Sequence, residues 1–161
     1  MKFKAVDAMP GLSFSAVGFG CWGISGGDTW NGTNDAESIR TVRAAVDLGV
    51  NVFDVAPVYG AGHAESVLGE ALEGRRDGVL IASKCGMVWD EHGVVRLDLS
   101  PQSITREVEQ SLRRLRTDHL DLYQMHWPDP KTPVEASMEA LEALRSAGKI
   151  RHRGCPESRG S

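Results

Sequence analysis

Short apolar runs alternate with longer amphipathic stretches along most of this chain. The apolar runs begin near residues 17, 52, 79 and 120, and the next is expected near residue 150. In the stretches between most of them, apolar residues recur with the period of an α-helix. Buried parallel strands are almost continuously apolar and are joined by helices, so the pattern predicts an α/β protein with a parallel sheet covered by helices. It does not distinguish an open sheet from a closed barrel.

Capping residues set the expected boundaries of the helices. The first helix begins at Asn34, with Glu37 placed for a capping box, and ends at Gly49. The second covers about residues 63–72. The third follows Ser100-Pro101, a cap with proline at the first helical position. Its predicted buried stripe consists of Ile104, Val108, Leu112 and Leu115.

The fourth predicted helix begins with Thr132 as cap, Pro133 at the first helical position and Glu135 at the third. Its apolar stripe is Val134, Met138, Leu141 and Leu144. Outside these units, residues 2–14 are predicted to form a hairpin, residues 16–20 a short strand before a glycine-rich loop, and residues 89–99 a long polar loop.

Composition narrows the expected partners. With 161 residues, of which 41% are apolar and 25% charged, the chain is long enough for one domain with a buried core. Its net charge of −4 gives no reason to expect nucleic acid or an anionic membrane as a partner. No apolar run reaches the roughly 20 residues that span a bilayer, and no signal peptide is recognisable, so a cytoplasmic location is expected. The three cysteines are widely spaced, which predicts reduced thiols and no metal site.

Four polar residues follow the predicted strands: Asp54, Tyr59, Lys84 and His126. In a barrel of alternating strands and helices, functional side chains converge from the C-terminal ends of different strands. Reduction of a carbonyl needs a proton donor at the oxygen where negative charge develops. Tyr59 is a suitable donor if the Lys84 cation lowers its pKa from about 10.

In the same interpretation, Asp54 keeps Lys84 charged and His126 orients the carbonyl by donating a hydrogen bond. Each of the four residues also has an ordinary structural explanation when it is taken alone. Tyr59 could be a packed aromatic ring and Asp54 a turn or cap residue. Lys84 could be a surface lysine and His126 a core imidazole.

Several segments together resemble the aldo-keto reductase superfamily. They are residues 49–60 (GVNVFDVAPVYG), 62–65 (GHAE), 82–84 (ASK) and 121–128 (DLYQMHWP). The resemblance runs from about residue 11 to residue 151, and Trp22, Gly26-Gly27 and Trp30 are similar to the bacterial stress-protein and inositol-operon branch. It implies an α/β fold of the (β/α)8 TIM-barrel family, of which this chain carries about four units after an N-terminal β-hairpin. It also implies NADP(H) as cofactor and Asp54, Tyr59, Lys84 and His126 as a catalytic tetrad, with Tyr59 as the general acid.

The same resemblance suggests which residues contact the ligands. Gly20, Cys21, Trp22 and Asp54 are expected beside the cofactor. A small-molecule carbonyl substrate is expected against Trp22, Tyr59, Trp89, His126 and Trp127. For Trp89, ordinary packing within the loop remains an equal alternative.

The sequence departs from the family after residue 151. Residues 1–151 correspond to the N-terminal half of the barrel, whereas residues 152–161 show no strand pattern and are interpreted as a non-family tail. A reading-frame shift, a natural truncation or a designed boundary would each explain it. The competing hypothesis is therefore a catalytically impaired half barrel that self-associates through exposed sheet edges. A third hypothesis is that the chain is a redox-sensing regulatory subunit.

Overall fold

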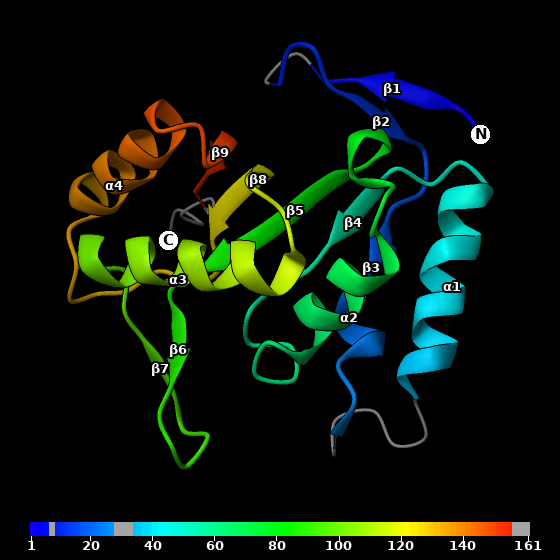
Figure 1. The fold of residues 1–161 in the computed structure, drawn as a ribbon. Helices are drawn as coiled ribbons and strands as arrows, with labels where there is room; N and C mark the ends of the chain where they lie inside the picture. Colours follow the sequence, from blue (N-terminus) through cyan, green and yellow to red (C-terminus); the bar gives the residue numbers. More distant parts are fainter. Residues whose placement is uncertain (7–8, 28–33, 156–161) are drawn as a thin grey trace, which may run out of the picture.

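The computed structural model describes residues 1–6, 9–27 and 34–155 (Figure 1). Its main sheet has five parallel strands in the order β3-β4-β5-β8-β9. The strands are β3 (Phe19–Gly20), β4 (Val52–Asp54), β5 (Leu80–Cys85), β8 (Leu120–Met125) and β9 (Ile150–Gly154). Each strand lies beside the next one along the chain, without the reversal of order that defines a doubly wound sheet. This singly wound order is the one found in a TIM barrel.

Helices connect the strands and lie on one side of the sheet (Figure 1). They are α1 (Asp35–Asp47), α2 (His63–Ala71), α3 (Pro101–Leu115) and α4 (Val134–Ser146). Contacts join α1 to α2, α2 to α3 and α3 to α4. The described chain is therefore part of a (β/α)8 barrel, with its helices in consecutive order around the outside.

Two of the three predicted helix caps are confirmed. The Asn34 side chain accepts a hydrogen bond from the backbone N–H of Glu37 at 2.8 Å, and the Ser100 side chain accepts one from Ser103 at 3.3 Å. The prediction for Thr132 is wrong: α4 has no side-chain cap, and the Thr132 hydroxyl donates instead to Asp129 at 2.7 Å. The nearby carboxylate competes successfully for this hydroxyl.

The core lies between the sheet and the helices. Phe53 and Ile81 of the sheet are fully buried, and the predicted stripe of α3 is buried along its whole length. In α4, Leu141 and Leu144 are buried, but Val134 is 47% exposed, so its predicted burial is wrong. Val134 is the first residue of its helix, ahead of the turns that contact the sheet.

The opposite face of the sheet is only partly covered. Strand register places Val52 beside Leu80, and Ala82 beside Leu122. These residues are half-buried and alternate with the buried residues that face the helices. A row of apolar side chains is consequently accessible on this face.

Two antiparallel hairpins accompany the sheet. The predicted N-terminal hairpin is present as β1 (Phe3–Ala5) and β2 (Ser13–Ser15). The stretch predicted as a long loop contains a second hairpin of β6 (Met87–Trp89) and β7 (Val95–Leu97), which corrects that prediction. Short 3-10 helices cover Cys21–Ile24 (η1) and Arg76–Gly78 (η3). The strand predicted over residues 16–20 is only two residues long.

Strand β9 corrects the prediction that strand structure ends at residue 151. It continues through Gly154 and pairs with β8, with His152 beside Leu122 and Gly154 beside Gln124. Backbone pairing with β8 maintains the strand although its side chains are mostly polar. The remainder of the predicted tail, residues 156–161, and also Trp30 lie outside the described residues. No helix in the described part of the chain is long and apolar enough to cross a membrane.

Candidate active site

Lys84 is the central residue of the predicted tetrad. It occupies the C-terminal part of β5, and only 8% of its surface is exposed. Its ammonium donates hydrogen bonds to Asp54 Oδ1 at 2.8 Å, to the Val55 carbonyl at 3.1 Å and to Tyr59 Oη at 3.4 Å. Three of the four predicted residues are therefore joined around one buried cation.

The position of Tyr59 depends on a tight loop after β4. The Tyr59 N–H donates to the Ala56 carbonyl at 3.0 Å, and the following Gly60 has a φ of 63°. A Cβ atom at Gly60 would lie 2.1 Å from the Ser25 carbonyl oxygen. Glycine is thus required where the loop crosses the end of η1, and this contact fixes the backbone beside the tyrosine.

His126 completes the group from the end of β8. The backbone N–H of His126 donates to the Cys85 carbonyl at 2.9 Å. The His126 ring meets that of Tyr59 edge-on, with the ring centroids 6.1 Å apart. Burial and the nearby Lys84 cation lower the pKa of His126 below its usual range, although Asp54 opposes this shift. The imidazole is consequently neutral near pH 7 and retains one N–H that can donate to a ligand.

The Lys84 ammonium lies between the hydroxyl of Tyr59 and the carboxylate of Asp54. The Lys84 ammonium contacts the phenolic oxygen and also lies 5.2 Å from the centre of the ring. Asp54 balances the lysine charge, and 47% of the Asp54 side chain remains exposed. The site therefore combines a buried cation with a partly open anion.

A buried carboxylate behind the tetrad was missed by the sequence predictions. Glu65 of α2 is fully buried, and it accepts hydrogen bonds from Ser83 Oγ at 3.0 Å and Arg114 Nε at 2.7 Å. Ser83 directly precedes Lys84, so this network ties β5 to α2 and α3. The available signal was a glutamate within the inward face of a helix. Its partner Arg114, however, is 49 residues away in the sequence.

The residues predicted beside the ligands differ in accessibility. Gly20 pairs with Asp54 in the sheet and has open space where a Cβ would lie. Trp22 and Trp127 are 55% and 58% exposed, and Trp127 stacks on His126. Cys21, by contrast, is completely buried, and burial raises the pKa of its thiol far above the usual value. It has no accessible surface for a cofactor in this structure.

Trp89 stands apart from the tetrad residues on the hairpin strand β6. It lines a cavity of about 660 Å³ together with Gly26, Gly60 and His63. Gly60 adjoins Tyr59, so this cavity opens beside the tyrosine loop. Both predicted alternatives for Trp89 are compatible with this position, because it packs within a hairpin and also borders a cavity.

Comparison with known proteins agrees with the fold that the strand order indicates. The sequence profile described as "Aldo/keto reductase family" matches residues 16–159. The chain belongs to the aldo/keto reductase family. The match to the family extends beyond residue 151 and includes the whole of β9.

Relatives of known sequence are about twice as long as this aldo/keto reductase chain. The aldo-keto reductase YhdN of Bacillus subtilis strain 168 is 44% identical, over 94% of this chain and 45% of its own length. The NADH-specific methylglyoxal reductase of Escherichia coli K12 is 38% identical, over 87% of this chain and 47% of its own length. The chain therefore spans about half the length of the curated relatives it matches.

Solved structures support the same assignment. Aldo-keto reductase AKR11C1 from Bacillus halodurans, in its holo form, has a TM-score of 0.85 and 35% identity, covering 96% of this chain and 50% of its own. An aldo-keto reductase from Klebsiella pneumoniae in complex with NADPH has a TM-score of 0.78 and 34% identity, with the same two coverages. These bacterial neighbours agree with the bacterial branch indicated by the sequence.

Proposed function

We propose that this chain provides the proton-transfer half of an NADP(H)-dependent oxidoreductase that reduces aldehydes and ketones to alcohols. The observation that carries the proposal is the contact of one buried ammonium, that of Lys84, with both Asp54 and Tyr59 Oη. Membership of the aldo/keto reductase family and the names of two relatives as methylglyoxal reductases support this reaction class.

The exposed residues near the tetrad fit one end of a nicotinamide cofactor. The open space above Gly20 and the adjacent exposed Trp22 leave room for a flat ring beside Asp54. When bound, such a cofactor would supply the hydride. The NADPH complex of the Klebsiella neighbour supports NADP(H), whereas the Escherichia coli relative is NADH-specific, so the choice between the two requires measurement.

Each tetrad residue has a defined role in this proposal. Tyr59 donates its proton to the carbonyl oxygen as negative charge develops there. Lys84 stabilises the resulting tyrosinate, and Asp54 holds the ammonium in position. The neutral His126 donates a hydrogen bond that orients the carbonyl. Trp22 and Trp127 provide apolar walls for the substrate.

The test replaces each of the two tyrosines of the chain in turn. Tyr59→Phe should reduce the rate of NADPH oxidation with methylglyoxal by about 10²- to 10⁴-fold, because it removes the general acid. Tyr123→Phe is the matched control, since the Tyr123 side chain is fully buried on the helix side of the sheet. Its rate should equal that of the wild type. Equal rates for Tyr59→Phe and the wild type would overturn the assignment.

A second candidate is a catalytically impaired half barrel that self-associates. It is favoured by the accessible apolar row that includes Val52, Leu80 and Leu122. It is favoured further by β3 and β9, which are edge strands of the described sheet. Native mass spectrometry should then show dimers or larger species, and NADPH should leave tryptophan fluorescence unchanged. A compact monomer with saturable quenching by NADPH would rule out this alternative.

A further inference from the structure

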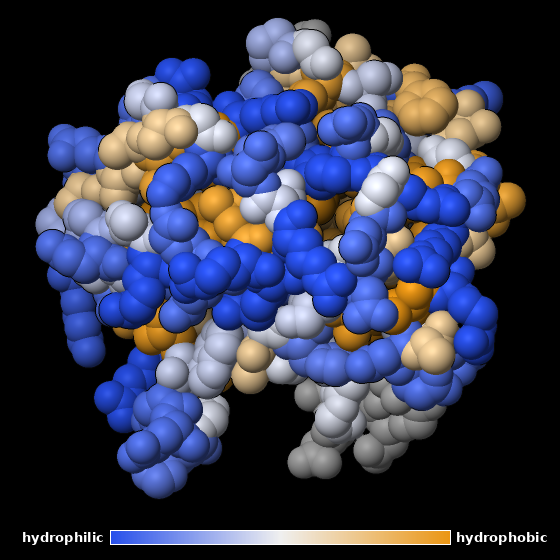
Figure 2. Space-filling model, in the orientation of Figure 1, coloured by the Kyte–Doolittle hydropathy of each residue, from blue (hydrophilic) through white to orange (hydrophobic). Residues whose placement is uncertain are grey.

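A second cleft lies on the helix side of the molecule, away from the tetrad. It has a volume of about 490 Å³ and is bounded by α3, by β6 and by the loop that follows β4. Its polar wall is formed by Arg106, Gln110, Arg113 and Arg114 of α3, and Trp89 and Pro57 contribute apolar surface. In Figure 2, hydrophilic residues form a band across this side of the molecule, where α3 runs in Figure 1.

The donors of the cleft share one face of α3. Arg106, Gln110 and Arg113 are spaced at i, i+4 and i+7, which aligns them along a helix. Arg106 and Arg113 are separated by about 10 Å along the axis at 1.5 Å per residue, within reach of two long side chains directed at one ligand. A guanidinium presents paired N–H groups that match phosphate oxygens.

These guanidinium groups are poorly compensated by protein carboxylates. Neither Arg106 nor Arg113 forms an ion pair with any residue in the described part of the chain; Arg106 donates only to Ser103 Oγ, at 3.0 Å. Arg114 is paired with Glu65 through Nε, but its buried Nη2 has no hydrogen-bond partner. By contrast, Arg116, on the same helix end, pairs with Glu73 at 3.2 Å.

The carboxylate in the cleft wall, Glu107, offsets the charge of these arginines only in part, and so does Asp98, which interacts electrostatically with Arg106. Glu107 accepts hydrogen bonds from the Gly86 N–H at 3.1 and 3.2 Å and from Ser103 Oγ at 3.1 Å. Burial raises the pKa of Glu107 to about 7, so a substantial fraction is uncharged near neutral pH. The cleft consequently retains excess positive charge.

We propose that this cleft binds a phosphate-bearing small molecule, at a site distinct from the catalytic tetrad. The guanidinium groups of Arg106 and Arg113 and the Gln110 amide bind the phosphate oxygens. The walls of Trp89 and Pro57 contact any organic part of the ligand. A free phosphate and a phosphomonoester share the first set of contacts, and only the phosphomonoester uses the second.

The position of the cleft couples it to the catalytic loop. Pro57 belongs to the segment between Asp54 and Tyr59, and Trp89 borders both this cleft and the cavity beside Gly60. Arg114 also lies against Gly62, where an added Cβ would meet its side chain at 2.7 Å. Binding of a phosphate group therefore places a negative charge beside the elements that position Tyr59. Trp89, which borders both cavities, lies next to that charge.

The test measures binding without turnover. Inorganic phosphate and glycerol 3-phosphate are titrated against the full chain by calorimetry at constant ionic strength, with chloride as the reference anion. Both ligands should saturate, and Arg106→Gln or Arg113→Gln should weaken each by about tenfold, because one charge-assisted contact is lost. Arg40→Gln, on α1 and outside the cleft, is the charge-matched control and should bind as the wild type does.

The two ligands and the tryptophan distinguish the source of the phosphate. Tighter binding of glycerol 3-phosphate, lost in Trp89→Ala, supports a phosphomonoester, whereas equal binding of both ligands supports inorganic phosphate. Equal affinities in Arg113→Gln, Arg40→Gln and the wild type would overturn the site. Displacement of phosphate by NADP⁺ at the same residues would overturn its separation from the cofactor. None of these outcomes depends on whether the chain reduces carbonyls.

Discussion

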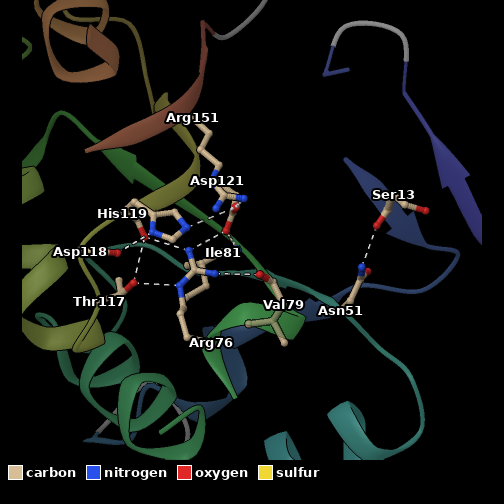
Figure 3. A network of polar contacts seen from close by, with 10 residues as sticks. All are labelled: Ser13, Asn51, Arg76, Val79, Ile81, Thr117, Asp118, His119, Asp121 and Arg151. Carbon is tan, nitrogen blue, oxygen red and sulfur yellow. Dashed lines mark hydrogen bonds and ion pairs between the residues drawn. The ribbon is translucent and has the colours of Figure 1, made fainter. Parts of the chain in front are cut away.

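The two ends of the parallel sheet use charged residues in opposite ways. At the N-terminal end, the Asp121 carboxylate is 2% exposed and is bound by Arg76 at 2.8 Å, by Arg151 at 3.1 Å and by the Ile81 N–H at 3.0 Å (Figure 3). At the C-terminal end, the buried ion is Lys84, and its partner Asp54 is half exposed.

The groups around the two buried ions also differ in how many hydrogen bonds they make. Arg76 also donates to the Val79 carbonyl, the His119 carbonyl and the Thr117 hydroxyl, so its guanidinium is held from several directions (Figure 3). The Tyr59 hydroxyl, by comparison, has one long hydrogen bond within the described residues, at 3.4 Å from Lys84. A guanidinium held by several protein groups stabilises the fold, whereas a hydroxyl with one long hydrogen bond can also bind a ligand. This division agrees with the general separation of stability and catalysis between the two ends of TIM barrels.

Removing the charge of Asp121 should produce the largest loss of stability. Asp121→Asn leaves the Arg76 and Arg151 cations without their buried counter-ion and should lower the free energy of unfolding by about 3 kcal/mol. Urea denaturation measures this change. Asp118→Asn, which alters a neighbouring exposed carboxylate, should change stability little. A similar small effect for both variants would show that the N-terminal network does not stabilise the sheet.

Glu107 should make stability depend on pH. Its pKa is raised from 4.5 to about 7 because burial penalises the charged form, so the folded state holds a proton that the unfolded state releases. The associated stabilisation is complete below about pH 4.5 and is lost as pH rises through about 7. The wild type should therefore lose about 2 kcal/mol in free energy of unfolding from pH 5 to pH 8 that Glu107→Gln does not lose.

Urea denaturation of both proteins at the two pH values checks this prediction. Glu142→Gln serves as the comparison, because Glu142 is exposed and hydrogen-bonded to Arg145 and Arg153, which lower its pKa to about 2. For Glu142→Gln, the difference in free energy of unfolding from the wild type should not change in favour of the variant between pH 5 and pH 8. A constant difference between Glu107→Gln and the wild type would contradict the buried-acid interpretation.

Asp54→Asn should have the smallest effect on stability. The Asp54 side chain is 47% exposed, so solvent screens its attraction to Lys84, and the loss should stay below about 1 kcal/mol. The same variant should still reduce NADPH oxidation, since Lys84 loses the partner that positions it. A loss of stability as large as that of Asp121→Asn would remove the distinction between the two ends of the sheet.

Much of the fold could be predicted because helix and strand periods were strong. The buried stripe of α3 follows from spacing alone. The order of the strands does not, because the same pattern of strands and helices fits an open doubly wound sheet, and only the family resemblance implied a barrel. The β6–β7 hairpin was missed because each of its strands has three residues and its burial is slight. The extension of β9 was missed because pairing with β8, rather than an apolar pattern, maintains His152 and Arg153 in a strand.

The candidate site was predictable only in part. Grouping of Asp54, Tyr59 and Lys84 follows from their positions at strand ends, because parallel strands bring those ends together. The bond from Glu65 to Arg114 joins residues on two helices, and no local pattern indicates it. The lowered pKa of His126 depends likewise on burial and on distance to Lys84, neither of which sequence spacing provides.

Strand β9 has a consequence for the behaviour of the chain in concentrated solution. It forms one edge of the described sheet, and it carries Arg151 and Arg153 on alternate positions. The other edge of β9 is already paired with β8, so pairing of β9 with the same strand of a second copy would be complete after one addition. Association through this edge would therefore yield pairs of molecules rather than fibrils.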